Sequence, residues 1–146
     1  MKLLQELAAE DRGRDVEAVL AHLPYARFLG LSVEQQGDEI ITLLPFDEHL
    51  VGNRNLPAIH GGVVGAMLEI TSNLQLIFDT ACERLPKTVD VSFDYLRSVG
   101  NATTYGRAIV TRQGRRVANV RAELWQASRD KPVAASHGHF LLTPLT

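Results

Sequence analysis

The sequence has a single cysteine, Cys82, no excess of basic residues and no long uninterrupted apolar run. One cysteine excludes an internal disulfide framework and a zinc site built from cysteines. With a net charge of -2, the chain lacks the excess of basic residues that is typical of nucleic-acid-binding proteins. The most apolar stretch, residues 59–78, contains Glu69, Asn73 and Gln75, so we expect no membrane span.

The N-terminal residues also lack the apolar core of a signal peptide, because Glu10, Asp11 and Arg12 soon follow the first leucines. Together with the lone cysteine, this favours the cytoplasm. A length of 146 residues and an apolar fraction of 45% fit one domain that buries a core without a metal or a disulfide. We therefore expect a single domain over residues 1–146, in which residues 1–23 form an N-terminal helical extension.

Helical spacing of apolar residues is strongest after a region rich in turn formers. Residues 24–31 are predicted to form a connector and residues 45–57 a loop. Between them, residues 32–36 and 39–44 flank a glycine turn and predict a short hairpin. From about Gly61 to about residue 81 the sequence has almost no polar face, which predicts a buried central helix.

After Pro86 the apolar residues recur at every second position. Strands are predicted at residues 88–95 and 103–112, then after the turn at Gln113-Gly114, and finally at residues 133–143. In the first of these, alternation places Val89, Val91, Phe93 and Tyr95 on one face toward the core. The order predicts an α+β fold, with an antiparallel sheet wrapped on one long helix.

Glu69 is the one carboxylate in the apolar part of the predicted central helix. An unpaired buried charge is costly, so its presence needs either a catalytic role or a structural partner such as Arg121 on the sheet. Helical spacing places several small or polar residues on the same side of the helix. This side predicts a groove that lets a ligand or another backbone approach closely, and its other members are Gly62, Gly65, Ser72 and Asn73.

Two motifs at this separation and in this element order carry a family resemblance. The first is His60-Gly61-Gly62 with Glu69 following, and the second is the strand sequence from Thr88 to Arg97. From about Tyr25 to the end, the chain resembles the hotdog-fold acyl-CoA thioesterases of the PaaI-like family. The resemblance implies a curved antiparallel sheet around a long helix, a homodimer or homotetramer, and active sites at the subunit interface.

The resemblance also implies roles for individual residues. Glu69 matches the catalytic carboxylate, as general base or nucleophile, and Gly61 matches the residue whose backbone N–H polarises the thioester carbonyl. Thr88 matches a Ser or Thr that reaches the reaction centre from the opposite subunit. We expect His60 to fix the loop before the helix, and Arg97 is a candidate for the phosphates of coenzyme A.

Two positions depart from the family pattern. Arg54 stands where some members have an asparagine, so Asn53 and Asn55 on either side become the candidates for orienting water. Pro57 stands where many members have glycine, and the conformation of this loop is therefore open. The remaining histidines, including the pair His137 and His139, do not have metal-ligand spacing near His60, and no metal is expected.

The function expected from the resemblance is hydrolysis of a medium-chain or aromatic acyl-CoA. No cofactor is expected, since coenzyme A is part of the substrate. Two alternatives stay open at this point: a hydratase or dehydratase acting on acyl thioesters, and a non-catalytic acyl-CoA-binding protein on the same fold.

Overall fold

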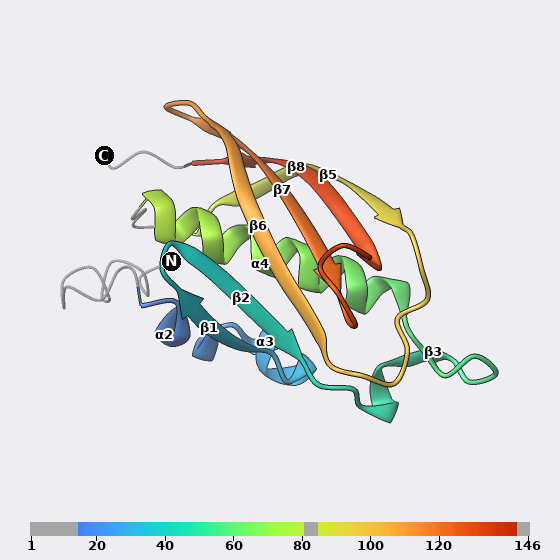
Figure 1. Cartoon of the computed structure of the whole chain (residues 1–146). Helices are drawn as coiled ribbons and strands as arrows, with labels where there is room; N and C mark the ends of the chain where they lie inside the picture. Colours follow the sequence, from blue (N-terminus) through green and yellow to red (C-terminus); the bar gives the residue numbers. More distant parts are fainter. Residues whose placement is uncertain (1–14, 81–84, 143–146) are drawn as a thin grey trace.

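The long central helix, α4 (Gly61–Thr80), lies against one face of a six-stranded antiparallel sheet with strand order β1-β2-β6-β7-β8-β5 (Figure 1). This computed structural model describes residues 15–80 and 85–142. The expected α+β architecture is confirmed. The strands of the sheet are β1 (Ser32–Gln36), β2 (Glu39–Leu44), β5 (Lys87–Tyr95), β6 (Thr104–Gln113), β7 (Val117–Trp125) and β8 (Ala134–Leu141).

Small side chains allow the sheet and α4 to pack closely. On β7, Ala118, Val120, Ala122 and Leu124 are all buried, as their alternation predicts. On β6, a Cβ added at Gly106 would lie 2.6 Å from Thr42 Oγ1 and 2.7 Å from Leu124 Cδ2. Close packing of this kind leaves no room for even one additional methyl group.

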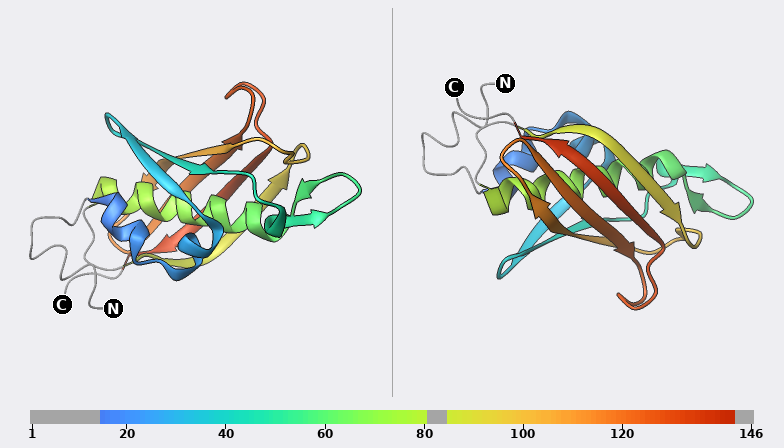
Figure 2. Two further views of the ribbon diagram at one scale, coloured as in Figure 1. Left: turned by 90° about the horizontal axis from the view of Figure 1, so that it is seen from below. Right: turned by 90° about the horizontal axis from the view of Figure 1, so that it is seen from above.

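The length and composition of α4 would allow it to cross a membrane, but 61% of its most apolar window is buried inside the protein. Its apolarity is explained by its position, because strands cover it on one side and the N-terminal helices flank it (Figure 2). The predicted start at Gly61 is confirmed, and the described helix ends at Thr80.

The first helices are α2 (Val16–Ala21) and α3 (Pro24–Leu29). Residues 1–14 of the expected helical extension lie outside the described residues. The prediction of a connector at residues 24–31 is wrong, because Pro24 suits the first turn of a helix and Gly30 ends it with φ of 78°. With only six residues, α3 is too short for a clear apolar period.

The loop predicted at residues 45–57 contains two short regular elements, so that prediction is wrong in part. The segment contains a 3-10 turn, η1 (Glu48–Leu50), and the strand β3 (Val51–Asn53), which pairs with β4 (Ala58–Ile59). This hairpin projects beyond the N-terminal end of α4 (Figure 2). At its turn, the Asn55 N–H donates to Asn53 Oδ1 at 3.0 Å.

β5 forms one edge of the sheet, and a bulge between Thr88 and Asp90 changes the direction of its side chains. Val89 is 61% exposed, so its predicted place toward the core is wrong. Thr88 reaches α4 instead. A bulge adds one residue to a strand and disturbs the alternation that the prediction assumed.

Candidate active site

Glu69 on α4 and Thr88 on β5 meet at the edge of the sheet. Thr88 Oγ1 donates a hydrogen bond of 2.9 Å to Glu69 Oε1 within one chain. The resemblance implied a threonine arriving from the opposite subunit, but no second chain is needed to join these two side chains. Glu69 is half-buried and Thr88 is exposed, so the expectation of a buried carboxylate is wrong. Its charge therefore needs no buried counter-ion.

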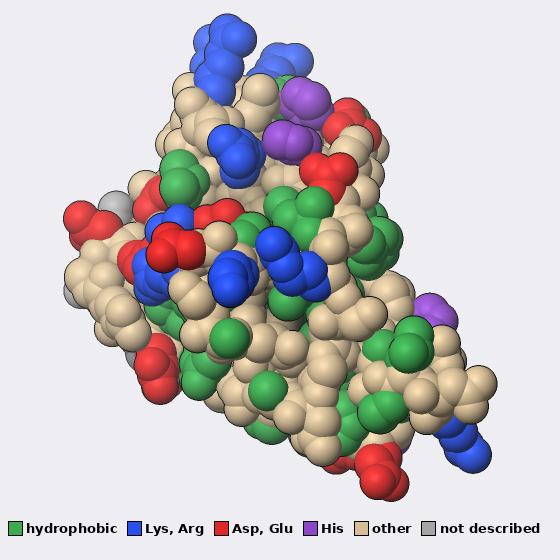
Figure 3. Space-filling model, turned by 45° about the vertical axis from the view of Figure 1, so that its right-hand side comes forward, with side chains coloured by type: hydrophobic (Ala, Val, Ile, Leu, Met, Phe, Trp, Pro, Cys, Tyr) green, Lys and Arg blue, Asp and Glu red, His purple; other side chains and the backbone are tan. Residues whose placement is uncertain are grey.

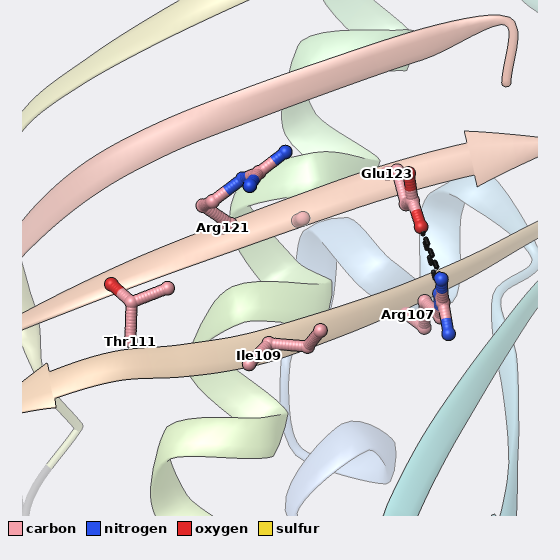
Figure 4. Close-up of a pocket in the computed structure, with 6 residues that line it drawn as sticks. Arg107, Ile109, Thr111, Arg121 and Glu123 are labelled. Carbon is pink, nitrogen blue, oxygen red and sulfur yellow. Dashed lines mark hydrogen bonds and ion pairs between the residues drawn. The ribbon is translucent and has the colours of Figure 1, made fainter.

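Arg121, the structural partner considered for Glu69, lies on the opposite face of the sheet. It lines a hollow of about 360 Å³ together with Ile109 and Thr111, and α4 lies behind the strands (Figure 4). In the same hollow Arg107 pairs with Glu123. Acidic and basic side chains are interspersed on the face seen in Figure 3. Within residues 15–80 and 85–142, no ion pair reaches Glu69.

In the first turn of α4, the backbone N–H groups differ in whether the described residues supply an acceptor. The carbonyl oxygen of His60 accepts from Val63 N at 2.9 Å and from Val64 N at 3.2 Å. Gly62 N donates to His60 Nδ1 at 2.8 Å, so the imidazole caps the helix. The Gly61 N–H has no acceptor among the described residues. It is therefore an available donor at the positive end of the helix dipole.

His60 is held in turn by the preceding segment. Its N–H donates to the carbonyl of Leu50 at 2.8 Å, and its side chain packs against Gly52, where an added Cβ would lie 2.8 Å from His60 Cδ2. These contacts support the expectation that His60 fixes the loop before the helix.

Gly61 and Glu69 lie on the same helix, just over two turns apart. At 1.5 Å of rise per residue this separates them by about 12 Å along the axis. A thioester carbonyl bound to the Gly61 N–H therefore lies beyond the reach of Glu69 in the same chain.

The predicted groove of small residues is filled by the chain itself. A Cβ at Gly65 would lie 3.2 Å from Phe93 Cζ and 3.5 Å from the Tyr95 hydroxyl. Gly65 therefore makes room for two aromatic rings of β5, and a ligand contact at this glycine stays a prediction. Gly62 is exposed beside His60.

Ser72 and Asn73, the other two predicted groove residues, do not contact Glu69 through hydrogen bonds. Ser72 is buried and its hydroxyl donates to the carbonyl of Leu68 at 2.9 Å. Asn73 Oδ1 is buried and has no hydrogen-bond partner in the described part of the chain.

A pocket of about 490 Å³ opens beside the start of α4, and Gly61, Tyr95 and Arg97 are among the residues that line it. The Tyr95 hydroxyl donates to the carbonyl of Gly61 at 3.0 Å. Arg97 donates from Nη1 to the carbonyl of Pro132 at 2.5 Å and is otherwise exposed. The alternation in β5 predicted a core position for Tyr95, and this prediction is wrong, because the side chain is 58% exposed. The spacing of Gly61 and Gly65 leaves one face of the helix without side chains. This spacing was the signal in the sequence for a bulky neighbour such as Tyr95.

Asn53 and Asn55 lie at the turn of the projecting hairpin and are exposed. The side chain of Asn53 already accepts the N–H of Asn55. No hydrogen bond joins either asparagine to Glu69 within the described chain. Arg54 and Pro57 line a separate pocket of about 460 Å³.

Histidine positions give no metal-binding cluster. Among the described residues, no group of three or more His, Cys, Asp or Glu side chains is placed to hold a metal ion. His139 Nδ1 lies 2.8 Å from Asp90 Oδ1, and its neighbour His137 is exposed on the same strand.

Comparison with known proteins gives a consistent family. The sequence profile of the thioesterase superfamily matches residues 56–133, more than half of the chain. The medium/long-chain acyl-CoA thioesterase YigI of Salmonella typhimurium is 31% identical, over 74% of this chain and 79% of the relative. The YigI protein of Escherichia coli K12 is 28% identical, with the same coverage.

Solved structures agree with the fold. A protein from Chromobacterium violaceum is 34% identical and superposes with a TM-score of 0.76, covering 100% of both chains. A putative thioesterase from Ralstonia eutropha, described as related to phenylacetic acid degradation, has a TM-score of 0.73 at 22% identity and covers 86% of this chain and 98% of its own.

The profile match covers β4, the second strand of the projecting hairpin, together with α4 and the strands β5, β6 and β7. It thus includes both the free Gly61 donor and the Glu69–Thr88 pair. The chain belongs to the thioesterase superfamily and is a thioester hydrolase of hotdog fold.

Proposed function

We propose that the protein hydrolyses medium-chain acyl-CoA thioesters in a site built from two chains, with the Gly61 N–H of one chain and Glu69 of the other. The observation that carries this proposal is the distance of about 12 Å between these groups along one helix. A second copy of the chain supplies the missing half. The names of the YigI relatives support an acyl-CoA substrate with a medium or long acyl chain.

In this reaction the thioester oxygen accepts the Gly61 N–H, which stabilises the negative charge that develops there. Glu69 takes a proton from water as the water oxygen bonds to the carbonyl carbon. The carbon–sulfur bond then breaks, and the coenzyme A thiolate leaves and is protonated. Direct attack by the carboxylate, through an anhydride that water then hydrolyses, gives the same products.

Thr88 holds one oxygen of the carboxylate through its hydroxyl. The other oxygen has no hydrogen-bond partner among the described residues, so it is available to water or substrate. The bonded partner of Glu69 is a threonine rather than a histidine, which supports hydrolysis over hydration of the acyl chain. Arg97, in the same pocket as Gly61, is placed to meet a phosphate of coenzyme A.

The edge of β5 supports pairing with a second chain. One side of this strand has no partner strand in the described sheet. The strand and the residue after it expose Val89 at 61%, Tyr95 at 58% and Leu96 at 50%. Unpaired edges with exposed apolar side chains favour association, and a homodimer is the smallest assembly that completes the site. We place this assembly in the cytoplasm.

Thiol release from a panel of short, medium, long and aromatic acyl-CoAs tests the proposal. We expect the highest kcat/KM with medium-chain substrates. Tight binding of acyl-CoA without thiol release would point to a binding protein, and a hydrated acyl-CoA product would point to a hydratase; either outcome contradicts the proposal.

A further inference from the structure

We infer that Tyr95 and His60 hold the two ends of a single peptide group, and that this clamp aims the Gly61 N–H at the substrate. The inference rests on the proposed function, because it assumes that the Gly61 N–H is the donor to the thioester. It adds Tyr95 as a positioning residue that acts through Gly61.

The peptide group between Gly61 and Gly62 is bonded at both ends. Its carbonyl oxygen, on Gly61, accepts from the Tyr95 hydroxyl at 3.0 Å. Its N–H, on Gly62, donates to His60 Nδ1 at 2.8 Å. Because the Nδ1 atom accepts, the imidazole has the tautomer that carries its proton on Nε2.

The neighbouring peptide group, between His60 and Gly61, is also anchored. Its carbonyl accepts the N–H groups of Val63 and Val64. Hydrogen bonds therefore hold both peptide groups that flank the Cα of Gly61, and within residues 15–80 and 85–142 the Gly61 N–H is the one group of these two peptides without a partner. Gly61 is the first residue of α4, so the helical backbone sets the general direction of this donor, and the bonds of the next peptide group with Tyr95 and His60 restrain it further.

Direction matters because an oxyanion donor works only when it is aligned before the charge develops. The Tyr95 ring adds a second restraint, since its Cε1 atom would lie 3.5 Å from a Cβ on Gly61. The tyrosine thus limits the movement of Gly61 on one side and bonds to its carbonyl on the same side.

The variant Tyr95→Phe keeps the ring and removes the hydroxyl. We expect kcat for a medium-chain acyl-CoA to fall about three- to tenfold, the loss that corresponds to one neutral hydrogen bond, with KM nearly unchanged. Tyr95 is 58% exposed, so the fold should persist. The matched control is Tyr25→Phe, since Tyr25 is 50% exposed and stacks on Phe28 away from this peptide. It should keep native kcat.

A double variant separates positioning from direct contact with substrate. Gly61→Pro removes the N–H, and proline is tolerated at the first position of a helix. If Tyr95 acts only through this N–H, Tyr95→Phe should cause no further loss of kcat in the Gly61→Pro background. If the loss of kcat in the double variant is the product of the losses in the two single variants, the inference is overturned. Native kcat in Tyr95→Phe alone would also overturn it. Native activity in Gly61→Pro alone would instead contradict the proposed function.

Hydrogen exchange gives a second readout that does not depend on turnover. The Gly62 amide should exchange faster in Tyr95→Phe than in the native protein, because one end of the peptide group has been released. In Tyr25→Phe its exchange should stay native. Unchanged exchange of Gly62 in Tyr95→Phe would contradict the clamp even if Gly61→Pro does not fold.

Discussion

The hydroxyl of Thr88 donates a 2.9 Å hydrogen bond to the carboxylate of Glu69, across the contact between the edge strand and the central helix. The other carboxylate oxygen accepts no hydrogen bond from the part of the chain that the structure describes. A charge-assisted bond of this kind is stronger than a neutral one.

Thr88→Val keeps the shape of the side chain and removes this hydroxyl. We expect kcat to fall about tenfold, since a hydrogen bond to a charged group contributes more than a neutral one. Stability should change little, because Thr88 is exposed. Steady-state kinetics and thermal melting check both points. Thr111→Val on the outer face of the sheet is the control, and equal kinetics in the two variants would argue against a role for Thr88.

Glu69→Gln retains an oxygen for Thr88 and removes the base. The variant should fold normally and lose about 10²- to 10⁴-fold in kcat, the contribution typical of a positioned base. Thiol release at saturating acyl-CoA measures the loss, and circular dichroism tests the fold. A native rate in this variant would mean that another group activates the water.

Gly106→Ala tests the close packing of α4 on the sheet. The new Cβ would lie 2.6 Å from Thr42 Oγ1, which itself bonds to Thr71 Oγ1 at 2.7 Å. Overpacking of this kind costs about 1–3 kcal/mol of unfolding free energy. Urea unfolding should show a lower midpoint than native. Gly100→Ala, where nothing lies within 4 Å of the added Cβ, should not lower it.

His49 and Asp47 form an exposed pair before the hairpin, 2.7 Å apart. The hydrogen bond with Asp47 raises the pKa of His49 above its ordinary value of 6.5, and the same bond lowers the pKa of Asp47 below 3.8. The raised histidine pKa stabilises the fold below pH 6.5, and this contribution is lost as pH rises through the folded pKa. The lowered aspartate pKa stabilises it above pH 3.8, and this contribution is lost as pH falls through the folded pKa.

An NMR titration of the His49 imidazole checks this pair. In Asp47→Asn the pKa of His49 should move down toward its ordinary value, because the charged partner is gone. Asp38→Asn serves as a remote control and should leave the titration unchanged. The same midpoint in all three proteins would contradict the pairing.

The sequence predicts the fold where one period dominates over many residues. The apolar run of α4 and the alternation in β7 each specify an element and the face it buries. Short elements such as α3 and the β3–β4 hairpin are missed because they hold too few residues to show a period. Their boundaries depend on local bonds, such as the one between Asn53 and Asn55.

The candidate site is only partly visible in the sequence. The motif names Gly61 and Glu69, but the bulge on β5 decides that Thr88, and not Val89, faces the carboxylate. Phe93 likewise occupies the space beside Gly65, and this contact joins segments that are distant in the sequence. Such contacts appear only once the strand and the helix are placed together.

Complementation between two inactive variants tests the two-chain site most directly. Gly61→Pro and Glu69→Gln subunits carrying different affinity tags are co-expressed, and the mixed dimers are purified. If each site combines Gly61 of one chain with Glu69 of the other, one site in the mixed dimer is intact and the other carries both changes. We predict about half of the native activity for such dimers, since one of two symmetric sites works. Mixed dimers as inactive as the parent variants would contradict the account.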